Sequence, residues 1–317
     1  MRRALLGAAA VLVFGVLTLG VRSRKLPEAP AHARVEPSLS NLPKVGVCWL
    51  EFARRDVPGR VAMAGFSTKP EWHVTVSGLL VRHPRGDVLV DAGFSSHYDE
   101  EIADYPTLLK FWLGQIKSEV LQSTPEALRA VGADPAKLTW VIPSHAHIDH
   151  AGGLVDLPGV PVLLPQEEIN FFAEYGTQKT RKVIPAHAKA VEGRMTAIHF
   201  ESKPYETFDE SADVFGDGSI VIVKLPGHTP GSIGTFVNVA PGKRFFHVGD
   251  TVNVVEAIAA RRPKSFVMAG TDHEADEANA VVSQLAQLQE KAPDVVILPA
   301  HDRDAWGRAF GGAPGCP

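Results

Sequence analysis

A histidine-rich turn directly after a predicted buried strand constrains this chain more than any other feature of its sequence. Residues 138–142 read as a short apolar strand, which runs into Pro-Ser-His-Ala-His-Ile-Asp-His-Ala-Gly-Gly at residues 143–153. His145 and His147 are two residues apart, so their imidazoles point the same way from an extended segment and can share one metal. Asp149 and His150 follow on the other side of the turn and can bind a second metal. Imidazole and carboxylate without thiolate suit zinc and its divalent neighbours, so the turn predicts a metal site at a strand end.

Three later residues complete this candidate site. His228, Asp250 and His301 each follow a predicted strand and stand beside glycine or proline. Ordinary surface or core histidines would not repeatedly fall at strand ends in this way. We therefore predict seven metal ligands: His145, His147, Asp149, His150, His228, Asp250 and His301. His187 and His199 are not expected to be ligands, because these seven fill a two-metal site.

The apolar pattern after residue 43 predicts strands followed by helices, twice over. In the first half we expect strands at 45–52, 73–82 and 87–91, helical structure within 98–122, and a helix with Thr124 as N-cap and Pro125 at its first position. In the second half we expect strands at 219–225, 231–239, 244–248 and 295–298, with a capping box at 271–274 opening a helix. This order predicts an α+β fold in which two sheets pack together with helices outside.

The N-terminus and the composition bear on compartment and partners. Arg2 and Arg3 precede an uncharged apolar run at residues 4–21, so residues 1–25 are predicted to be a signal or a membrane anchor, with a retained anchor favoured. We therefore expect an exported protein, periplasmic or anchored facing outside the cytoplasm. Residues 26–43 are predicted to be a proline-rich linker, and residues 44–317 the folded domain. A net charge of −4 without a long basic run gives no reason to expect a nucleic-acid partner, and the sequence leaves the oligomeric state open.

The two cysteines, Cys48 and Cys316, are too few for a disulfide framework or a thiolate metal site. Free thiols are the favoured interpretation, and a single bridge in an oxidising compartment is the alternative.

In their order and spacing, the seven predicted ligands resemble those of the metallo-β-lactamase superfamily of metal-dependent hydrolases. The resemblance covers nearly all of residues 44–310 and includes residues 90–94, similar to the family's early Asp-x-Gly turn. It implies a four-layer αββα sandwich with the site at one edge between the sheets. It also implies that His145, His147 and His228 form site one, that Asp149, His150 and His301 form site two, and that Asp250 bridges the metals. Asp91 is then interpreted as a carboxylate that orients a histidine N–H, with a simple turn aspartate as the alternative.

The chemistry expected of such a site is hydrolysis. Two divalent ions, most simply Zn²⁺, lower the pKa of a shared water from 15.7 toward roughly 7, so that metal-bound hydroxide can attack the substrate. Asp149 is the predicted residue to orient that water or to shuttle its proton. The most similar branch is that of the acyl-homoserine lactonases, which implies a small-molecule ester or lactone substrate. Hydrolysis of a β-lactam or a phosphodiester remains the alternative.

One position departs from the lactonase pattern. Those lactonases commonly place a carbonyl-binding tyrosine three residues after the bridging aspartate, where this chain has Asn253. Asn253 is a candidate catalytic residue through its amide, or equally a turn residue. Residues 177–208, between the two halves, are rich in basic and aromatic side chains; they are expected to roof the site or to form a surface excursion.

Overall fold

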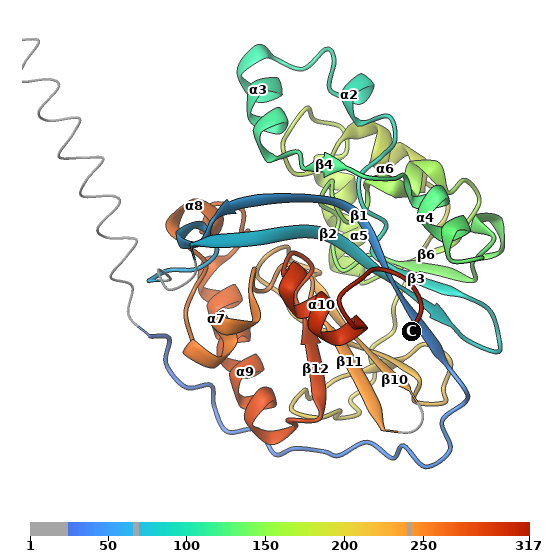
Figure 1. The fold of residues 1–317 in the computed structure, drawn as a ribbon, viewed down its shortest axis with the longest axis vertical. Coiled ribbons are helices and arrows are strands. Elements are labelled where there is room, and N and C mark those ends of the chain that lie inside the picture. The colour runs from blue at the N-terminus through green and yellow to red at the C-terminus, as the bar shows by residue number, and fades with distance from the viewer. Residues whose placement is uncertain (1–24, 66–69, 240–241) are drawn as a thin grey trace, which may run out of the picture.

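A computed structural model describes residues 25–65, 70–239 and 242–317, which form two sheets packed face to face (Figure 1). The first sheet has the order β4-β1-β2-β3-β5-β6-β7, and the second has the order β12-β11-β10-β9-β8. The strands of the first sheet are β1 (Gly46–Pro58), β2 (Glu71–Arg82), β3 (Val88–Val90), β4 (Glu119–Val120), β5 (Trp140–Ile142), β6 (Val162–Leu164) and β7 (Met195–Ala197). Those of the second are β8 (Ala212–Asp213), β9 (Ile220–Lys224), β10 (Ile233–Val239), β11 (Lys243–His247) and β12 (Val295–Leu298).

Helices cover the outer faces of both sheets, as Figure 1 shows for α4 to α6 on one side and for α7 and α9 on the other. The α-helices are α2 (Tyr98–Glu101), α3 (Thr107–Ile116), α4 (Thr124–Ala130), α5 (Gln166–Tyr175), α6 (Pro185–Val191), α7 (Val255–Ala260), α8 (Phe266–Ala269), α9 (Ala275–Lys291) and α10 (Arg303–Phe310). Short 3-10 helices are η1 (Gly59–Val61), η2 (Pro135–Lys137) and η3 (Gly152–Asp156).

Three apolar clusters give the molecule its layers. One lies between the sheets and joins Leu79 of β2 with Ile222 of β9. A second packs Leu89 of β3 against helix residues of the first half, and a third packs Phe246 of β11 against Leu285 of α9. Alternate residues of the strands therefore face the inner core and the outer helices. The predicted α+β sandwich is confirmed.

The strand directions place the candidate ligands at one edge. Strands β1, β2 and β3 pair antiparallel in chain order, and β3 then pairs in parallel with β5. In the second sheet, β11 pairs in parallel with β12. Because parallel strands end at the same edge, Asp91 lies beside the histidine turn that follows β5. For the same reason, Asp250 lies beside His301.

Local helix predictions were right for residues 98–122 and wrong at the starts of α4 and α9. The helical structure predicted within 98–122 is present as α2 and α3, which are separated at Pro106. The region ends in the short strand β4, because Lys117 is extended at the end of α3. Thr124 lies inside α4 and donates its hydroxyl to the carbonyl of Ala92, while Ser123 is the N-cap.

The predicted capping box at residues 271–274 does not form. Helix α9 begins at Ala275, with Glu274 as N-cap and no side-chain cap. The Thr271 hydroxyl donates instead to the carbonyl of Met268, at 2.6 Å, so it is not available to cap the helix.

The proline-rich segment is held against the domain rather than extending from it. The backbone N–H of Leu26 donates to the carbonyl of Arg261, and Val35 forms a bridge with Glu206. The Arg34 guanidinium lies 2.6 Å from the buried Glu206 carboxylate. Residues 26–43 are therefore a packed strap.

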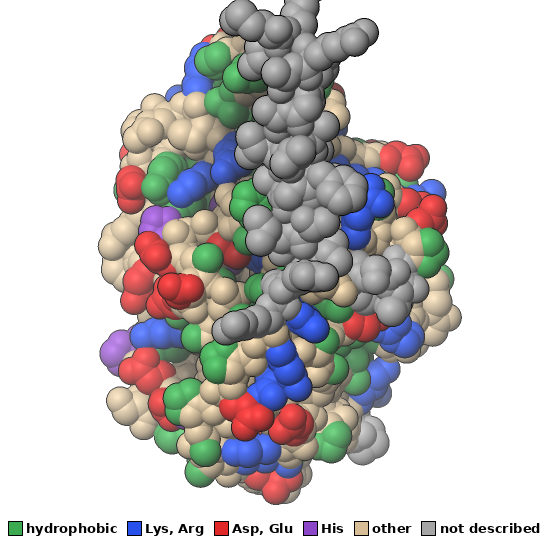
Figure 2. All heavy atoms as spheres, turned by 90° about the vertical axis from the view of Figure 1, so that its left-hand side faces the viewer, with side chains coloured by type: hydrophobic (Ala, Val, Ile, Leu, Met, Phe, Trp, Pro, Cys, Tyr) green, Lys and Arg blue, Asp and Glu red, His purple; other side chains and the backbone are tan. Residues whose placement is uncertain are grey.

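The predicted signal or anchor falls almost wholly on residues 1–24, outside the described residues. Within the described ranges, none of the helices combines the length and apolar character needed to cross a bilayer. On the face drawn in Figure 2, acidic and basic side chains are interspersed wherever described residues are in view.

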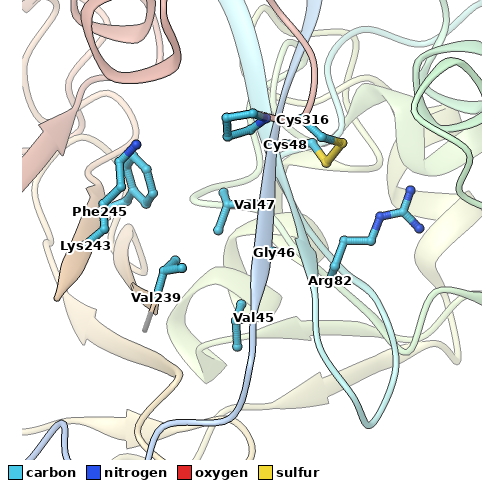
Figure 3. Close-up of a pocket in the computed structure, with 10 residues that line it drawn as sticks. Val45, Gly46, Val47, Cys48, Arg82, Val239, Lys243, Phe245 and Cys316 are labelled. Carbon is cyan, nitrogen blue, oxygen red and sulfur yellow. A yellow bond between two sulfur atoms is a disulfide. The ribbon is translucent and has the colours of Figure 1, made fainter. Parts of the chain in front are cut away.

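Cys48 and Cys316 form a disulfide, so the prediction of free thiols was wrong. The bond joins β1 to the C-terminal segment, where Trp49 and Gly315 also pair through two backbone hydrogen bonds of 2.9 Å. That pairing brings the two cysteines to the same place, although 268 positions separate them in sequence. A cavity of about 270 Å³ lies beside the disulfide, lined in part by Arg82, Lys243 and Phe245 (Figure 3). None of the predicted metal ligands lines it.

Candidate metal centre

Three histidines converge at the edge of the sandwich as predicted for site one. His145 and His147 come from the turn after β5, and His228 from the turn after β9. His147 Nδ1 lies 3.1 Å from His145 Nε2 and 3.0 Å from His228 Nε2. Such an arrangement of three nitrogens suits a single cation of the zinc type.

A second group of ligands lies next to the first. Asp149, His150 and His301 bring a carboxylate oxygen and two imidazole nitrogens within 4.8 Å of one another. His301 Nε2 is 3.3 Å from Asp149 Oδ2. The three residues come from the turn after β5 and the turn after β12, so the two sheets meet at this group.

Asp250 lies between the two groups and faces both. Its Oδ2 atom is 3.5 Å from His228 Nε2, and its Oδ1 atom is 3.1 Å from His301 Nε2 and 3.3 Å from His150 Nε2. This is the position expected of a bridging ligand, with one oxygen toward each site.

The buried polar atoms of the site fit divalent cations. His150 Nε2 and Asp250 Oδ1 are both buried, and neither makes a hydrogen bond. A buried polar atom without a hydrogen bond is costly even beside an oppositely charged group, and cations bound by both residues would remove that cost. Nitrogen and oxygen donors without thiolate match the chemistry of zinc and related ions.

The electrostatics favour the metal-binding forms of His145, His147 and Asp250, whereas the carboxylates favour a protonated His301. Burial and the neighbouring histidines hold the pKa of His145 and of His147 well below the usual range, which leaves neutral imidazoles. Burial alone would raise the pKa of Asp250, but His301 and His150 lower it well below its usual value. Burial alone would lower the pKa of His301, but Asp250 and Asp149 raise it to about 10. Without metal, this carboxylate pair therefore retains a proton on His301, in the place that a cation would take.

In His150 and His301, the outer ring nitrogen, Nδ1, which points away from the candidate metal site, has a fixed hydrogen-bond partner. His150 Nδ1 lies 2.8 Å from Asp91 Oδ2, and His301 Nδ1 donates to the carbonyl of Thr75 at 2.7 Å. Asp91 also accepts hydrogen bonds from the backbone N–H and the hydroxyl of Ser144. Such partners orient metal-binding imidazoles. The interpretation of Asp91 as an orienting carboxylate is supported over that of a simple turn residue.

Glu168 was missed by sequence reasoning, although it joins the two histidine-bearing turns. From α5, its carboxylate accepts hydrogen bonds from the backbone N–H of Ala146 at 2.6 Å, the Thr229 hydroxyl at 2.7 Å and the Gly231 N–H at 3.0 Å. Burial raises the pKa of Glu168 to about 7 against these three donors. In the sequence it is one of two adjacent glutamates in an amphipathic helix, so nothing local marks it. Lys264 and Asp272, which contact His228, were also missed.

Asn253, His187 and His199, which the sequence analysis also considered, each have partners or surroundings outside the candidate metal site. The Asn253 amide donates to the carbonyl of Ala62 at 2.8 Å, which favours the turn role over the catalytic role for this residue. His187 is buried, with Nε2 2.8 Å from Glu101 Oε2. His199 is exposed.

The segment 177–208 reaches across from α3 toward α8. Arg181 stacks over Trp112, 5.1 Å from the ring centre, and donates to the carbonyl of Gly270 at 2.8 Å. Lys182 lies over Tyr175, whose ring contacts Phe171, and the centroid of Phe171 is 6.1 Å from that of His147. Arg181 and Lys182 of this segment therefore lie against aromatic residues of α3 and α5, whereas Tyr205 packs against Phe236 in the core.

Comparison with known proteins agrees with this geometry. A sequence model of the metallo-beta-lactamase superfamily matches residues 72–301, a range that contains all seven predicted ligands. The chain belongs to the metallo-beta-lactamase superfamily. Among curated members, it is 25% identical over 247 residues to the N-acyl homoserine lactonase AttM of Rhizobium radiobacter, covering 74% of this chain and 85% of that protein.

Solved structures of the superfamily share the fold. A mutant of AiiA from B. thuringiensis with N-decanoyl-L-homoserine bound at its active site aligns with a TM-score of 0.64 at 17% identity, covering 84% of this chain and 96% of that one. AidC, described as a dizinc quorum-quenching lactonase, aligns with a TM-score of 0.57 at 17% identity over 87% and 92% of the two chains. Recognition of the superfamily from the ligand pattern is thus confirmed.

Proposed function

We propose that this protein hydrolyses small lactones or related esters with two divalent metal ions, most simply zinc. The observation that carries the proposal is the place of Asp250, whose two oxygens face different groups of histidines. His145, His147 and His228 would hold one ion, and Asp149, His150 and His301 the other. The similarity to curated N-acyl homoserine lactonases and to a dizinc lactonase supports the substrate class and the metal.

Two divalent ions bound here would supply an acidified water and an electrophile for the substrate carbonyl. The contribution of the chain itself is to hold the candidate ligands in fixed orientations. The outer nitrogens of His150 and His301 are held by Asp91 and by Thr75, so these rings cannot turn away from the site.

Asp149 is the residue that we assign to orient water and to pass its proton. Its side chain is 23% exposed, whereas those of His150 and His301 are almost fully buried. Burial alone would raise the pKa of Asp149, but His150 and His301 hold it well below its ordinary value, so the group is an ionised carboxylate that can accept a hydrogen bond from water.

The substrates that we propose first are N-acyl homoserine lactones. A carboxylate shared between two ions offsets part of their charge and fixes their separation, which favours attack on an ester carbonyl over stabilisation of an amide leaving group. We therefore expect clear turnover of lactones or activated esters and poor turnover of β-lactams.

We further propose that the protein is exported. The apolar run at residues 4–21 favours export, and the disulfide between Cys48 and Cys316 requires an oxidising compartment to persist. Fractionation of cells that express the full chain tests this: we expect the oxidised protein outside the cytoplasm. Recovery of reduced protein from the cytoplasm would contradict it.

The activity is tested by giving the zinc-loaded protein a panel of lactones, a chromogenic cephalosporin and a phosphodiester. Asp250→Asn should lose most lactone hydrolysis and bind one metal more weakly than the other. Efficient hydrolysis of the cephalosporin, with no lactone or ester turned over, would overturn the proposal in favour of a β-lactam hydrolase.

A further inference from the structure

The outer nitrogen of His228 has two buried partners of opposite charge. His228 Nδ1 lies 2.7 Å from Asp272 Oδ1 and 3.0 Å from Lys264 Nζ. The ammonium and the carboxylate are themselves 2.5 Å apart, and the three side chains are only 1 to 5% exposed. His228 is thus the corner of a closed triangle with Lys264 and Asp272.

Backbone contacts hold this triangle in place. Lys264 forms an isolated β-bridge with Met63, just before α8. Asp272 lies in the turn between α8 and α9, where the N–H of the next residue, His273, contacts the carbonyls of Gly227 and His228 at 3.0 Å. The turn that carries Asp272 is therefore fastened to the turn that carries His228.

The two partners favour different tautomers of the ring. His228 offers Nε2 to site one only when its proton is on Nδ1, and this N–H can donate to Asp272. The Lys264 ammonium is only a donor, so a hydrogen bond from it to Nδ1 requires Nδ1 to be bare. The proton would then be on Nε2, which faces Asp250 at 3.5 Å and could not bind a cation.

The second metal site is arranged differently. There the orienting carboxylate Asp91 accepts hydrogen bonds from the neutral groups of Ser144 while it holds His150 Nδ1. Asp272 instead has an ammonium as its partner, which offsets its charge and competes for the same nitrogen.

We propose that Asp272 is a positioning residue that selects the metal-binding tautomer of His228, and that Lys264 opposes this selection and so weakens site one relative to site two. The inference rests on the proposed two-metal function. It concerns how firmly the chain holds the cation of site one.

The test is a mutant cycle in the full chain, read by zinc titration and elemental analysis. Asp272→Ala should lower the affinity of site one about 10- to 100-fold and leave about one zinc per chain, because Lys264 is then the remaining partner of Nδ1. Lys264→Met should retain both ions and bind the cation of site one more tightly than the native chain does; unchanged affinity would show that Lys264 does not oppose Asp272. The double variant should recover affinity relative to Asp272→Ala, since the competing donor is gone.

Two further variants separate positioning from folding. Asp272→Asn keeps a carbonyl oxygen for the His228 N–H and should rescue much of the binding. Asp276→Ala, an exposed carboxylate in the first turn of α9, should bind zinc as the native protein does. Thermal melts of every variant show whether the fold is retained.

The tautomer itself is read by ¹⁵N NMR of the histidines in metal-free protein. We expect His228 to be protonated at Nδ1 in the native chain and at Nε2 in Asp272→Ala. Native zinc affinity in Asp272→Ala, or a double variant no better than Asp272→Ala, would overturn the proposal. If the native chain binds zinc but hydrolyses no lactone, ester or related substrate, the proposed function fails while these binding and NMR results still decide the role of Asp272.

Discussion

Asp91 holds the outer nitrogen of His150 at 2.8 Å, from a backbone position that a side-chain-bearing residue seldom adopts. The φ angle of Asp91 is 59°, in the left-handed region. This angle turns the chain sharply after β3 and brings the carboxylate against the histidine turn after β5. This backbone conformation costs of order 1 kcal/mol or more, and it places the Asp91 carboxylate where it orients the candidate metal ligand His150.

Asp91→Asn should weaken the metal site that contains His150, because a neutral amide orients the ring less firmly. We expect the affinity of this one site to fall about 10- to 100-fold, with the other site nearly unchanged. Zinc titration measures this directly. Asp87→Asn, in the turn before β3, is the control; equal losses in both variants would show that the effect is on folding.

The partly buried His147 and the buried His187 should behave differently when each is replaced by alanine. His147→Ala removes a ligand, so we expect loss of a bound metal and of activity by orders of magnitude. His187→Ala removes the partner of Glu101 and should lower the melting temperature while both metals stay bound. Elemental analysis and thermal melting check the pair, and loss of metal in His187→Ala would contradict the ligand assignment.

Reduction of the disulfide should destabilise the domain without emptying the metal site. Chain-entropy arguments give a loss of up to about 5 kcal/mol for a loop of this length. We expect a lower midpoint of urea unfolding for the reduced protein and for Cys316→Ser, with native zinc content. The Cys316→Ser midpoint should not respond to reductant, and a response would show that reductant acts elsewhere.

Asp217 should contribute to stability at neutral pH and lose that contribution in acid. Burial raises its pKa, but hydrogen bonds from Ser219, Arg85 and His83 lower it further, to about 2 from an ordinary 3.8. The stabilisation is therefore complete above pH 3.8 and disappears as the pH falls toward 2. Asp217→Asn should cost about 1 to 2 kcal/mol at pH 6 and little near pH 2. Urea unfolding of both proteins across this range measures the difference, and a constant difference would exclude the pKa as its cause.

The grouping of the candidate ligands was predictable from the sequence because they lie in the turns that follow strands: His145, Asp250 and His301 each come three residues after the end of β5, β11 or β12. The end of a strand fixes where the residues of the following turn lie in the fold. The positions of His145 and His301 could therefore be predicted from the local sequence alone. The layers were predictable for the same reason, since apolar periods of strands and helices are local properties.

What the sequence did not reveal depends on partners far along the chain. Glu168 matters because α5 places it between two turns, one of them 63 positions away at Gly231. Asp272 lies 44 positions after His228. The capping box failed for a related reason: the Thr271 hydroxyl bonds backward to Met268, and Asp272 turns toward His228. When a side chain hydrogen-bonds to a partner far along the chain, it does not adopt the role, such as helix capping, that the neighbouring residues in sequence predict.

The bond between Cys48 and Cys316 makes one covalent ring of almost the whole domain. Every strand of the second sheet and all seven candidate ligands lie inside that ring, while the strap at residues 26–43 lies outside it. A single proteolytic cut between the two cysteines therefore opens the ring without releasing a fragment. A nicked molecule would keep both halves of its metal centre tethered to each other for as long as the bridge remains oxidised.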